Sequence, residues 1–568
     1  MHRSDSHARL ASRRRLLQAG AVGLVGATAG CLGDDGADDT GDDTDDTGDD
    51  TAAPGDDSAD DTGADDGAED ELSQWEEREG GTLFFAQDAA PIDFDPIDET
   101  DGTSTAIKSQ VFSFLYEYAQ NSTEVVAEGL ATQLPELERD GTRWIVPITD
   151  EAYFHNGDPV TAEDVRYSFQ APIDEERNLA SSFEIFENIE TIDEHTVQFD
   201  LSHPYEGQIH NMTMRIVPKE VRENDVEAFG DEVVIGSGPF EFVDWEEGQE
   251  VVMRRWDDYW GDELPHIEEM VWVPVEEATT RVTELQTDSV DIIQDVIPDL
   301  RPQVEGMDDA HLMEQETLHY MFGAFVFAGE TAKRDVRRGV SHCVDLNSAV
   351  EAQMGDTGNR VYSPVDPLAE AWDFPVDRWQ GMDEERDVDR ARELFEQAGV
   401  PDDWEFIIIT PPDDLRADLA LSIANGVTEA GYNGRVRQLD WGAFMETYLT
   451  EDPDQLNMYL VTLTPDPDPH QYLWLLTHET GALNGTGWEH DEYMEILETA
   501  WQSTDHDERR ELYIDAVDIL LEERIHLTIA NQNATYGVKD YVKDTGLQPT
   551  AVNYPDIFSH RRNAWLDI

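Results

Sequence analysis

The chain has 568 residues, 127 of them acidic and 37 basic, so its formal net charge is −90. Such a charge excludes nucleic acid as a natural partner, because phosphate backbones attract basic surfaces. A hydrophobic content of 39% with 14 Trp and 17 Tyr excludes a wholly disordered chain.

The first 31 residues have the pattern of an export signal. A twin-arginine patch within Ser12–Leu17 precedes the small apolar run 19–30, which is too short for a membrane span of ~20 residues. The ending Ala29-Gly30-Cys31 resembles a lipoprotein cleavage box. We therefore predict lipidation at Cys31, and an uncleaved anchor or a disordered N-terminus is the alternative.

An acidic tether is predicted to follow, over residues 32–79. It repeats Asp-Asp-Thr and Gly-Asp-Asp units and cannot bury enough apolar surface to fold. Calcium binding is the alternative for such repeats, but no closing glutamate stands at the required offset. A solvated spacer is favoured.

The rest of the chain is also acidic: residues 72–568 include 107 acidic and 32 basic residues, and only five residues of the whole chain are lysine. This composition resembles the surfaces of proteins from salt-loving archaea. Screening at 1 M salt acts over ~3 Å and would remove most of the self-repulsion. We expect dialysis to low salt to lower the melting temperature sharply; a melt that is indifferent to salt would contradict the halophilic interpretation.

Hydrophobic spacing and turn residues predict the first elements of the body. Pro147 suggests that its strand lies at a sheet edge, and Thr161 with Asp164 has the spacing of a capping box. The predicted elements are a strand at 82–87, a loop at 88–102, a helix at 107–118, a strand at 142–149, a helix at 162–170 and two strands within 189–201.

Further along, the pattern predicts two α/β lobes. A strand at 271–274, a helix at 279–287 and a strand at 290–294 make a βαβ unit, which requires parallel strands. Cys343 falls in a predicted helix at 336–350, where a buried apolar role is favoured over a nucleophile. Other predicted elements are the strand pair 240–245 and 250–254, strands at 406–410, 435–439 and 456–463, helices at 415–430 and 443–449, and an extended end at 525–568 that returns to the first lobe.

Several motifs, in order from about Thr82 to Ala564, resemble extracellular solute-binding proteins of family 5, the peptide-binding components of ABC importers. They include Phe154-His155-Asn156-Gly157-Asp158-Pro159, Gly236-Ser237-Gly238-Pro239-Phe240, Asp257-Asp258-Tyr259-Trp260-Gly261, Arg334-Asp335-Val336-Arg337-Arg338-Gly339 and Asp389-Arg390-Ala391-Arg392.

The resemblance implies an α/β, periplasmic-binding-protein-like fold of the class II, cluster C type: two α/β lobes around a ligand cleft, plus a family-specific lobe. It implies a monomeric, non-catalytic binder on the outer face of the membrane, without cofactor, that serves an ABC permease and ATPase. The expected lobes are residues 80–111 with 234–327 and 525–568, residues 112–233, and residues 328–524.

The segment 462–474 is the strongest candidate for ligand contact. Its alternating prolines hold the chain extended, and peptide binders of the family carry an aspartate here that grips the ligand's amino terminus. In this chain Pro465 stands at the position of that aspartate, and the adjacent Asp466 could take its role. We therefore expect Asp466 and its neighbours Thr464 and Asp468 to contact the ligand. A stiff surface loop is an equal alternative, and a metal site with His470 is a weaker one.

Other residues match cleft positions of the family. Trp441 matches a cleft-lining tryptophan, and a large aromatic side chain suits a wall that accepts varied ligands. Asp101, Gln294 and Tyr320 fall at further cleft positions by rough alignment. Arg215, Arg254 and Arg255 could meet a ligand carboxylate, although neutralising nearby acids is their default role.

Two other classes of function stay open. A secreted glycosidase or peptidase is one, although the chain has no Gly-x-Ser-x-Gly or His-Glu-x-x-His motif; a structural surface adhesin is the other. Within the binding class, the sequence leaves peptides, nickel complexes and oligosaccharides as possible ligands.

Overall fold

The computed structural model describes residues 78–98, 102–177, 179–411, 413–448, 455–463, 466–479, 481 and 483–568. The chain divides into two units, Met1–Glu77 and Arg78–Ile568, and the sheets and cavities belong to the second. The predicted signal, its Cys31 and the tether as far as Glu77 lie outside the described residues.

A seven-stranded sheet, here the first sheet, has the order β12-β19-β11-β1-β10-β9-β8. Strand β1 pairs in parallel with β10 on one side and β11 on the other, and α8 (Ala278–Gln286) connects these two, which confirms the predicted βαβ unit. The strands are β1 (Thr82–Gln87), β8 (Phe240–Glu246), β9 (Glu250–Arg255), β10 (Glu269–Pro274), β11 (Ile292–Ile293), β12 (Ala310–Gln315) and β19 (Ala534–Lys539).

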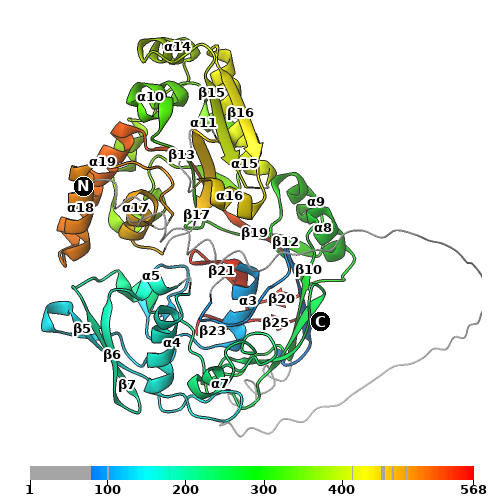
Figure 1. Cartoon of the computed structure of the whole chain (residues 1–568). Helices are drawn as coiled ribbons and strands as arrows, with labels where there is room; N and C mark the ends of the chain where they lie inside the picture. Colours follow the sequence, from blue (N-terminus) through cyan, green and yellow to red (C-terminus); the bar gives the residue numbers. More distant parts are fainter. Residues whose placement is uncertain are drawn as a thin grey trace, which may run out of the picture. The chain divides into compact units, whose positions relative to one another are not determined.

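The second sheet has six strands in the order β14-β18-β13-β17-β15-β16 and lies above the first in Figure 1. Along β13, Tyr320 and Phe322 belong to one apolar core and Met321 to another, so helices cover both faces. The strands are β13 (Tyr320–Phe325), β14 (Gly358–Arg360), β15 (Glu405–Thr410), β16 (Asn433–Gln438), β17 (Met458–Leu463) and β18 (His526–Gln532), and the helices that connect β15, β16 and β17 are α15 (Asp414–Glu429) and α16 (Trp441–Tyr448).

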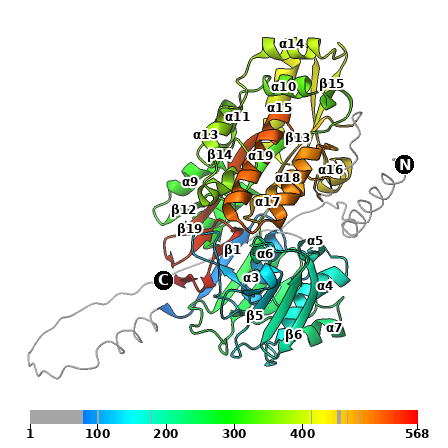
Figure 2. The same cartoon turned by 90° about the vertical axis from the view of Figure 1, so that its left-hand side faces the viewer.

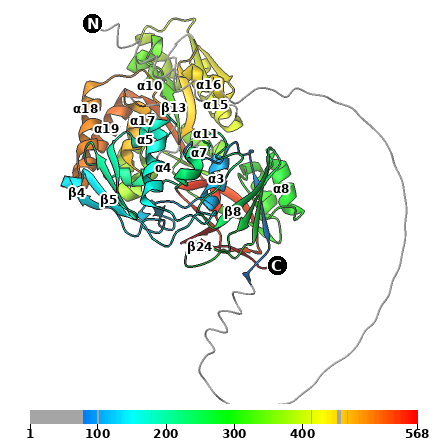
Figure 3. The ribbon, with the colours of Figure 1, turned by 60° about the horizontal axis from the view of Figure 1, so that its bottom comes forward.

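The third sheet is antiparallel, with the order β4 (Glu136–Glu138), β5 (Arg143–Pro147), β7 (Thr196–Leu201) and β6 (Phe186–Asp193). Helix α4 (Ala162–Asp174) packs against β6 and β7, and α3 (Gly102–Val111) packs against β8 (Figure 3). Thr161 and Asp164 form the predicted capping box at the start of α4. The first and third sheets contribute to one continuous apolar core.

Several local predictions were wrong, each because of tertiary packing. Strand β5 lies between β4 and β7, and beyond the end of β4 the backbone N–H of Thr132 donates to Pro147 O at 3.1 Å, so Pro147 does not lie at a sheet edge. The first helix ends at Val111 because the buried segment after it bonds instead across the fold, with Leu115 N donating to Met214 O.

The second half of the chain shows three further differences. Cys343 is buried in the turn between α10 (Arg334–Ser341) and α11 (Leu346–Met354), where Asp345 caps the second helix. The segment predicted to stay extended after β17 instead begins α17 (Pro469–Thr477). The C-terminal segment returns to the first sheet only at β19, because β18 belongs to the second sheet.

Two segments cross between the first and second sheets. One joins β12 to β13, and the other joins β18 to β19 through Asn533 alone. They lie side by side, since Thr317 Oγ1 donates to Gln532 O at 2.6 Å and Asn531 Nδ2 donates to Thr317 O. Paired crossing strands of this kind can act as a hinge.

The remaining helices and strands connect these sheets and cover their faces (Figure 2). They are α5 (Ala180–Phe183), α6 (Gln208–Asn211), α7 (Lys219–Asn224), α9 (Arg301–Glu305), α12 (Ala369–Trp372), α13 (Val376–Gln380), α14 (Val388–Gln397), α18 (Asp491–Gln502), α19 (His506–Glu523), β2 (Glu117–Tyr118), β3 (Val125–Val126), β20 (Val542–Lys543), β21 (Gly546–Gln548), β22 (Ala551–Asp556), β23 (Phe558–Ser559), β24 (Arg562–Asn563) and β25 (Trp565–Leu566).

Candidate ligand site

A cavity of about 320 Å³, here the cleft cavity, combines residues from three distant parts of the chain. Its size is that of a site for a small organic ligand. Asp466 is its one described lining residue from the segment between β13 and β18. The other lining residues are Thr105, Phe114, Tyr116, Glu117, Tyr118, Leu179, Ser182, Phe183, His210, Asn211, Thr213, Met214, Arg215, Gln548, Thr550 and Arg561.

Asp466 offers a carboxylate to this cavity. The residue is half-buried, and its side chain makes no hydrogen bond or ion pair to any residue that the structure describes. Burial and the neighbouring Asp468 raise the pKa of Asp466 to about 6. At neutral pH the group is therefore ionised and available to a cation.

Arg215 lies in the opposite wall of the cleft cavity. Its Nη2 donates to Ser109 Oγ at 2.6 Å, and its guanidinium lies 4.5 Å from the ring centroid of Phe114. A guanidinium held over an aromatic ring in a partly closed cavity suits the carboxylate of a ligand. Arg254 and Arg255 do not line the cleft cavity. Arg255 pairs with Asp257 and Glu79 and so neutralises nearby acids, as the sequence predicts.

Tyr118 and His210 form a stacked pair in the same wall. Tyr118 Oη lies 3.3 Å from His210 Nδ1, and the ring planes are 19° apart. Burial lowers the pKa of His210 to about 4, so the imidazole is neutral at physiological pH. Burial and the charge of Asp466 raise the pKa of Tyr118, so the wall presents neutral polar groups.

Asp468 has a different environment from Asp466. It is buried, with Oδ2 accepting from Arg509 Nη2 at 2.8 Å and Oδ1 accepting from His470 N and Tyr205 Oη. Burial opposes ionisation, but Arg509, the imidazoles of His470 and His210 and the backbone N–H of His470 together outweigh it and lower the pKa of Asp468. The carboxylate is thus engaged within the protein and lines neither cavity.

The other sequence candidates lie away from the cleft cavity or outside the description. Tyr320 is in the core, with Oη 3.2 Å from His526 Nδ1, and Gln294 is buried beside β1, its backbone N–H donating to Ala86 O. Trp441 begins α16, but its side chain is not described, and Asp101 and Thr464 lie outside the described residues.

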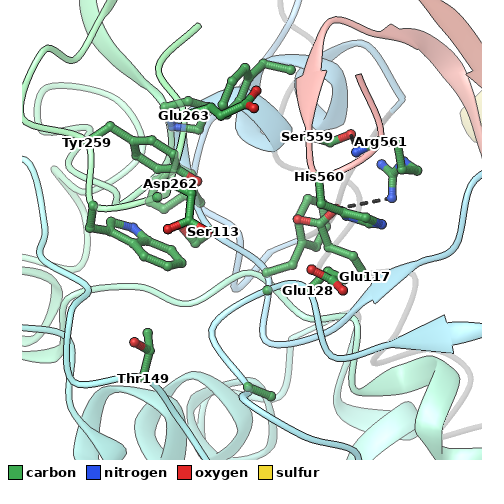
Figure 4. A pocket seen from close by; sticks show the side chains of 18 of the residues that line it. Ser113, Glu117, Glu128, Thr149, Tyr259, Asp262, Glu263, Ser559, His560 and Arg561 are labelled. Carbon is green, nitrogen blue, oxygen red and sulfur yellow. Dashed lines mark hydrogen bonds and ion pairs between the residues drawn. The ribbon is translucent and has the colours of Figure 1, made fainter. Parts of the chain in front are cut away.

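A second cavity of about 610 Å³, here the acidic cavity, shares Phe114, Glu117 and Arg561 with the first. Figure 4 shows Tyr259, Asp262 and Glu263 on one side of it and Ser559, His560 and Arg561 on the other. Arg561 pairs with Glu117 and Asp556. The lining carboxylates that form no ion pair within the described ranges are Glu128, Glu151, Asp262 and Glu263.

Sequence reasoning missed most of the wall opposite Asp466. Gln548 and Arg561 come from the C-terminal segment, whose return to the first lobe was predicted without naming contacts. Arg561 Nη1 donates to Tyr118 O at 2.6 Å and so ties that segment to β2. No local motif marks these residues, because the C-terminal segment, the β2–β3 hairpin and α6 meet only in the folded protein.

Among the described residues, no group of three or more His, Cys, Asp or Glu side chains is placed to hold a metal ion. No described helix combines the length and apolar character needed to cross a membrane.

The chain has two sheets with connecting helices, joined by paired crossing segments, and a cavity lined by residues from both sides of this junction. This arrangement is typical of a solute-binding protein. The chain belongs to the bacterial extracellular solute-binding proteins, family 5: the model of the middle part of this family matches residues 125–484. Members of this family are binding proteins, which disfavours the hydrolase alternative.

Known relatives share most of the chain. The oligopeptide-binding protein AppA of Bacillus subtilis is 24% identical over 394 residues, 65% of this chain and 71% of that protein. Di/tripeptide-binding protein 1 of Pseudomonas aeruginosa is 22% identical over 512 residues, which cover 83% of this chain and 93% of that protein. The structure of DppA from Helicobacter pylori in complex with the peptide STSA has a TM-score of 0.75 at 21% identity, covering 87% of this chain and 100% of that one.

Proposed function

We propose that this protein is the substrate-binding component of an ABC importer and captures short peptides in the cleft cavity. The observation that carries the proposal is Asp466, an ionised carboxylate without a protein partner among the described residues, in a cavity wall opposite Arg215. An acid and a guanidinium match the ammonium and carboxylate of a zwitterionic peptide. The peptide-binding relatives support the same ligand class.

Binding would close the two sheets around the peptide without covalent chemistry. A ligand that contacts Asp466 from one side and the Arg215 wall from the other favours the closed arrangement over the open one. The crossing segments at Thr317 and Asn533 supply the hinge. The closed complex would then deliver the peptide to a membrane permease served by an ATPase.

The N-terminal segment gives the proposed location. Lipid on Cys31 would anchor the mature protein to the outer face of the membrane after twin-arginine export. Both the export signal and the lipidation site are inferred from the sequence alone. Residues 34–71 of the tether, 19 of which are acidic, could reach at most ~125 Å. The body could thus meet a permease while it stays near the membrane of a salt-loving cell.

Titration calorimetry with trialanine in molar salt tests the proposal. We expect one peptide per chain and recovery of intact trialanine by mass spectrometry. N-acetyl-trialanine, which lacks the ammonium, should bind far more weakly. Cleavage of the peptide, or the absence of binding for a panel of di- to pentapeptides, would overturn the proposal.

Peptide affinity should fall about tenfold between pH 7 and pH 5. Asp466, with its pKa of about 6, is ionised at the upper pH and protonated at the lower, so the ammonium loses its partner as pH falls. The peptide amine, with a pKa near 8, stays charged across this interval. Calorimetry at both pH values measures the change; equal affinities would show that Asp466 is not the contact.

A further inference from the structure

A loop after the third sheet reaches into the helices of the second sheet. The loop 202–207 follows β7, and its Tyr205 is only 3% exposed. Tyr205 Oη donates to Asp468 Oδ1 at 3.2 Å. Figure 2 shows α17, which begins directly after Asp468, above α6, which follows the loop.

The receiving site for Tyr205 is built from aromatic and charged side chains. Arg509 pairs with Asp468 at 2.8 Å, and its guanidinium lies 5.5 Å from the Tyr205 ring centroid. The His470 ring lies 5.7 Å from that of Tyr205. The same loop makes a second contact, in which the ring centroids of His203 and Trp501 lie 4.2 Å apart.

Both partners of this hydrogen bond are close in sequence to walls of the cleft cavity. Tyr205 precedes α6, which contributes His210 and Asn211 to one wall, and Asp468 follows Asp466, which belongs to the other. The bond therefore joins the two sides of the cavity. Ligand binding and this bond share one requirement, the closed arrangement.

We propose that Tyr205 is a latch that determines how long a ligand is held: its hydroxyl engages Asp468 when the cavity closes and positions the Asp466 segment against the α6 wall. The ligand part of this inference rests on the proposed function. A hydrogen bond to a buried carboxylate is stronger than one to a neutral group. Loss of this hydrogen bond shifts the equilibrium from the closed toward the open arrangement. The apparent affinity for ligand then falls in proportion to the fraction of closed molecules.

The substitution Tyr205→Phe removes the hydroxyl and keeps the ring. Spin labels on cysteines introduced at the exposed Glu190 in β6 and Glu498 in α18 report the distance between the two sides, with Cys31 replaced by serine and the buried Cys343 retained. In ligand-free full-length protein in molar salt, we expect the ratio of open to closed molecules to rise about tenfold. Trialanine should dissociate about tenfold faster.

Tyr513→Phe is the matched control. Tyr513 also bonds Arg509, at 3.2 Å, but both residues belong to α19, so the bond does not join the two sides. This variant should keep the wild-type distance distribution and dissociation rate. If Tyr205→Phe also keeps both, or if Tyr513→Phe changes them equally, the latch is overturned. If trialanine does not bind the wild type, the proposed ligand class fails, and the ligand-free distances alone decide on the latch.

Discussion

Replacing Asp466 by asparagine is expected to weaken trialanine binding roughly 100-fold. The amide cannot form the charged pair with the peptide ammonium, and a hydrogen bond between charged groups contributes about 1.5–3 kcal/mol. Folding stability should not fall, because Asp466 has no partner to lose among the described residues and its charge is repelled by Asp468. Calorimetry and a thermal melt in molar salt measure the two effects separately.

Two controls accompany this variant. N-acetyl-trialanine should bind Asp466→Asn and wild-type protein with similar weak affinity, because it lacks the ammonium that the carboxylate recognises. The peptide affinity of Asp466→Asn should also be nearly independent of pH between 5 and 7. An asparagine variant that binds trialanine as tightly as the wild type would remove Asp466 from the site.

Replacing Arg509 by alanine is expected to destabilise the folded protein by about 3–5 kcal/mol. The change leaves the Asp468 carboxylate, whose side chain is 3% exposed, without its ion pair. It also removes the guanidinium packed near the rings of Tyr205, Trp372 and Tyr513. Urea unfolding at constant molar salt measures the loss.

Arg390→Ala is the comparison for this experiment. Arg390 pairs with Glu393 at 3.0 Å, but the two side chains are 39% and 62% exposed. Exposed pairs contribute about 0–1 kcal/mol, and concentrated salt weakens them further. Similar losses for the two variants would mean that the Asp468–Arg509 pair has no special role in stability.

The sequence predicted those parts of the fold that depend on local patterns. The capping box at Thr161 and the βαβ unit around α8 follow from residue types a few positions apart, and both are present. The predictions failed where a distant partner decides. Leu115 could extend a helix by its pattern, yet its backbone bonds to Met214.

The same distinction applies to the site. Asp466 and Asp468 were identified together because the proline-rich segment follows a strand and matches the place of a ligand-binding aspartate in peptide binders of the family. Their different surroundings could not be predicted, because Arg509 is 41 residues from Asp468 in sequence and Tyr205 is 263 residues away. Gln548 and Arg561, in the opposite wall, reach it through the C-terminal hairpins.

The place of β19 affects the biosynthesis of the protein. This strand pairs with β11 and β12, so the first sheet lacks an interior strand until residues 534–539 have left the ribosome. Domains that are contiguous in sequence can fold one after another during translation. Here β1 can pair with β10 and β11 earlier, but the first sheet is complete only when β19 has been synthesised.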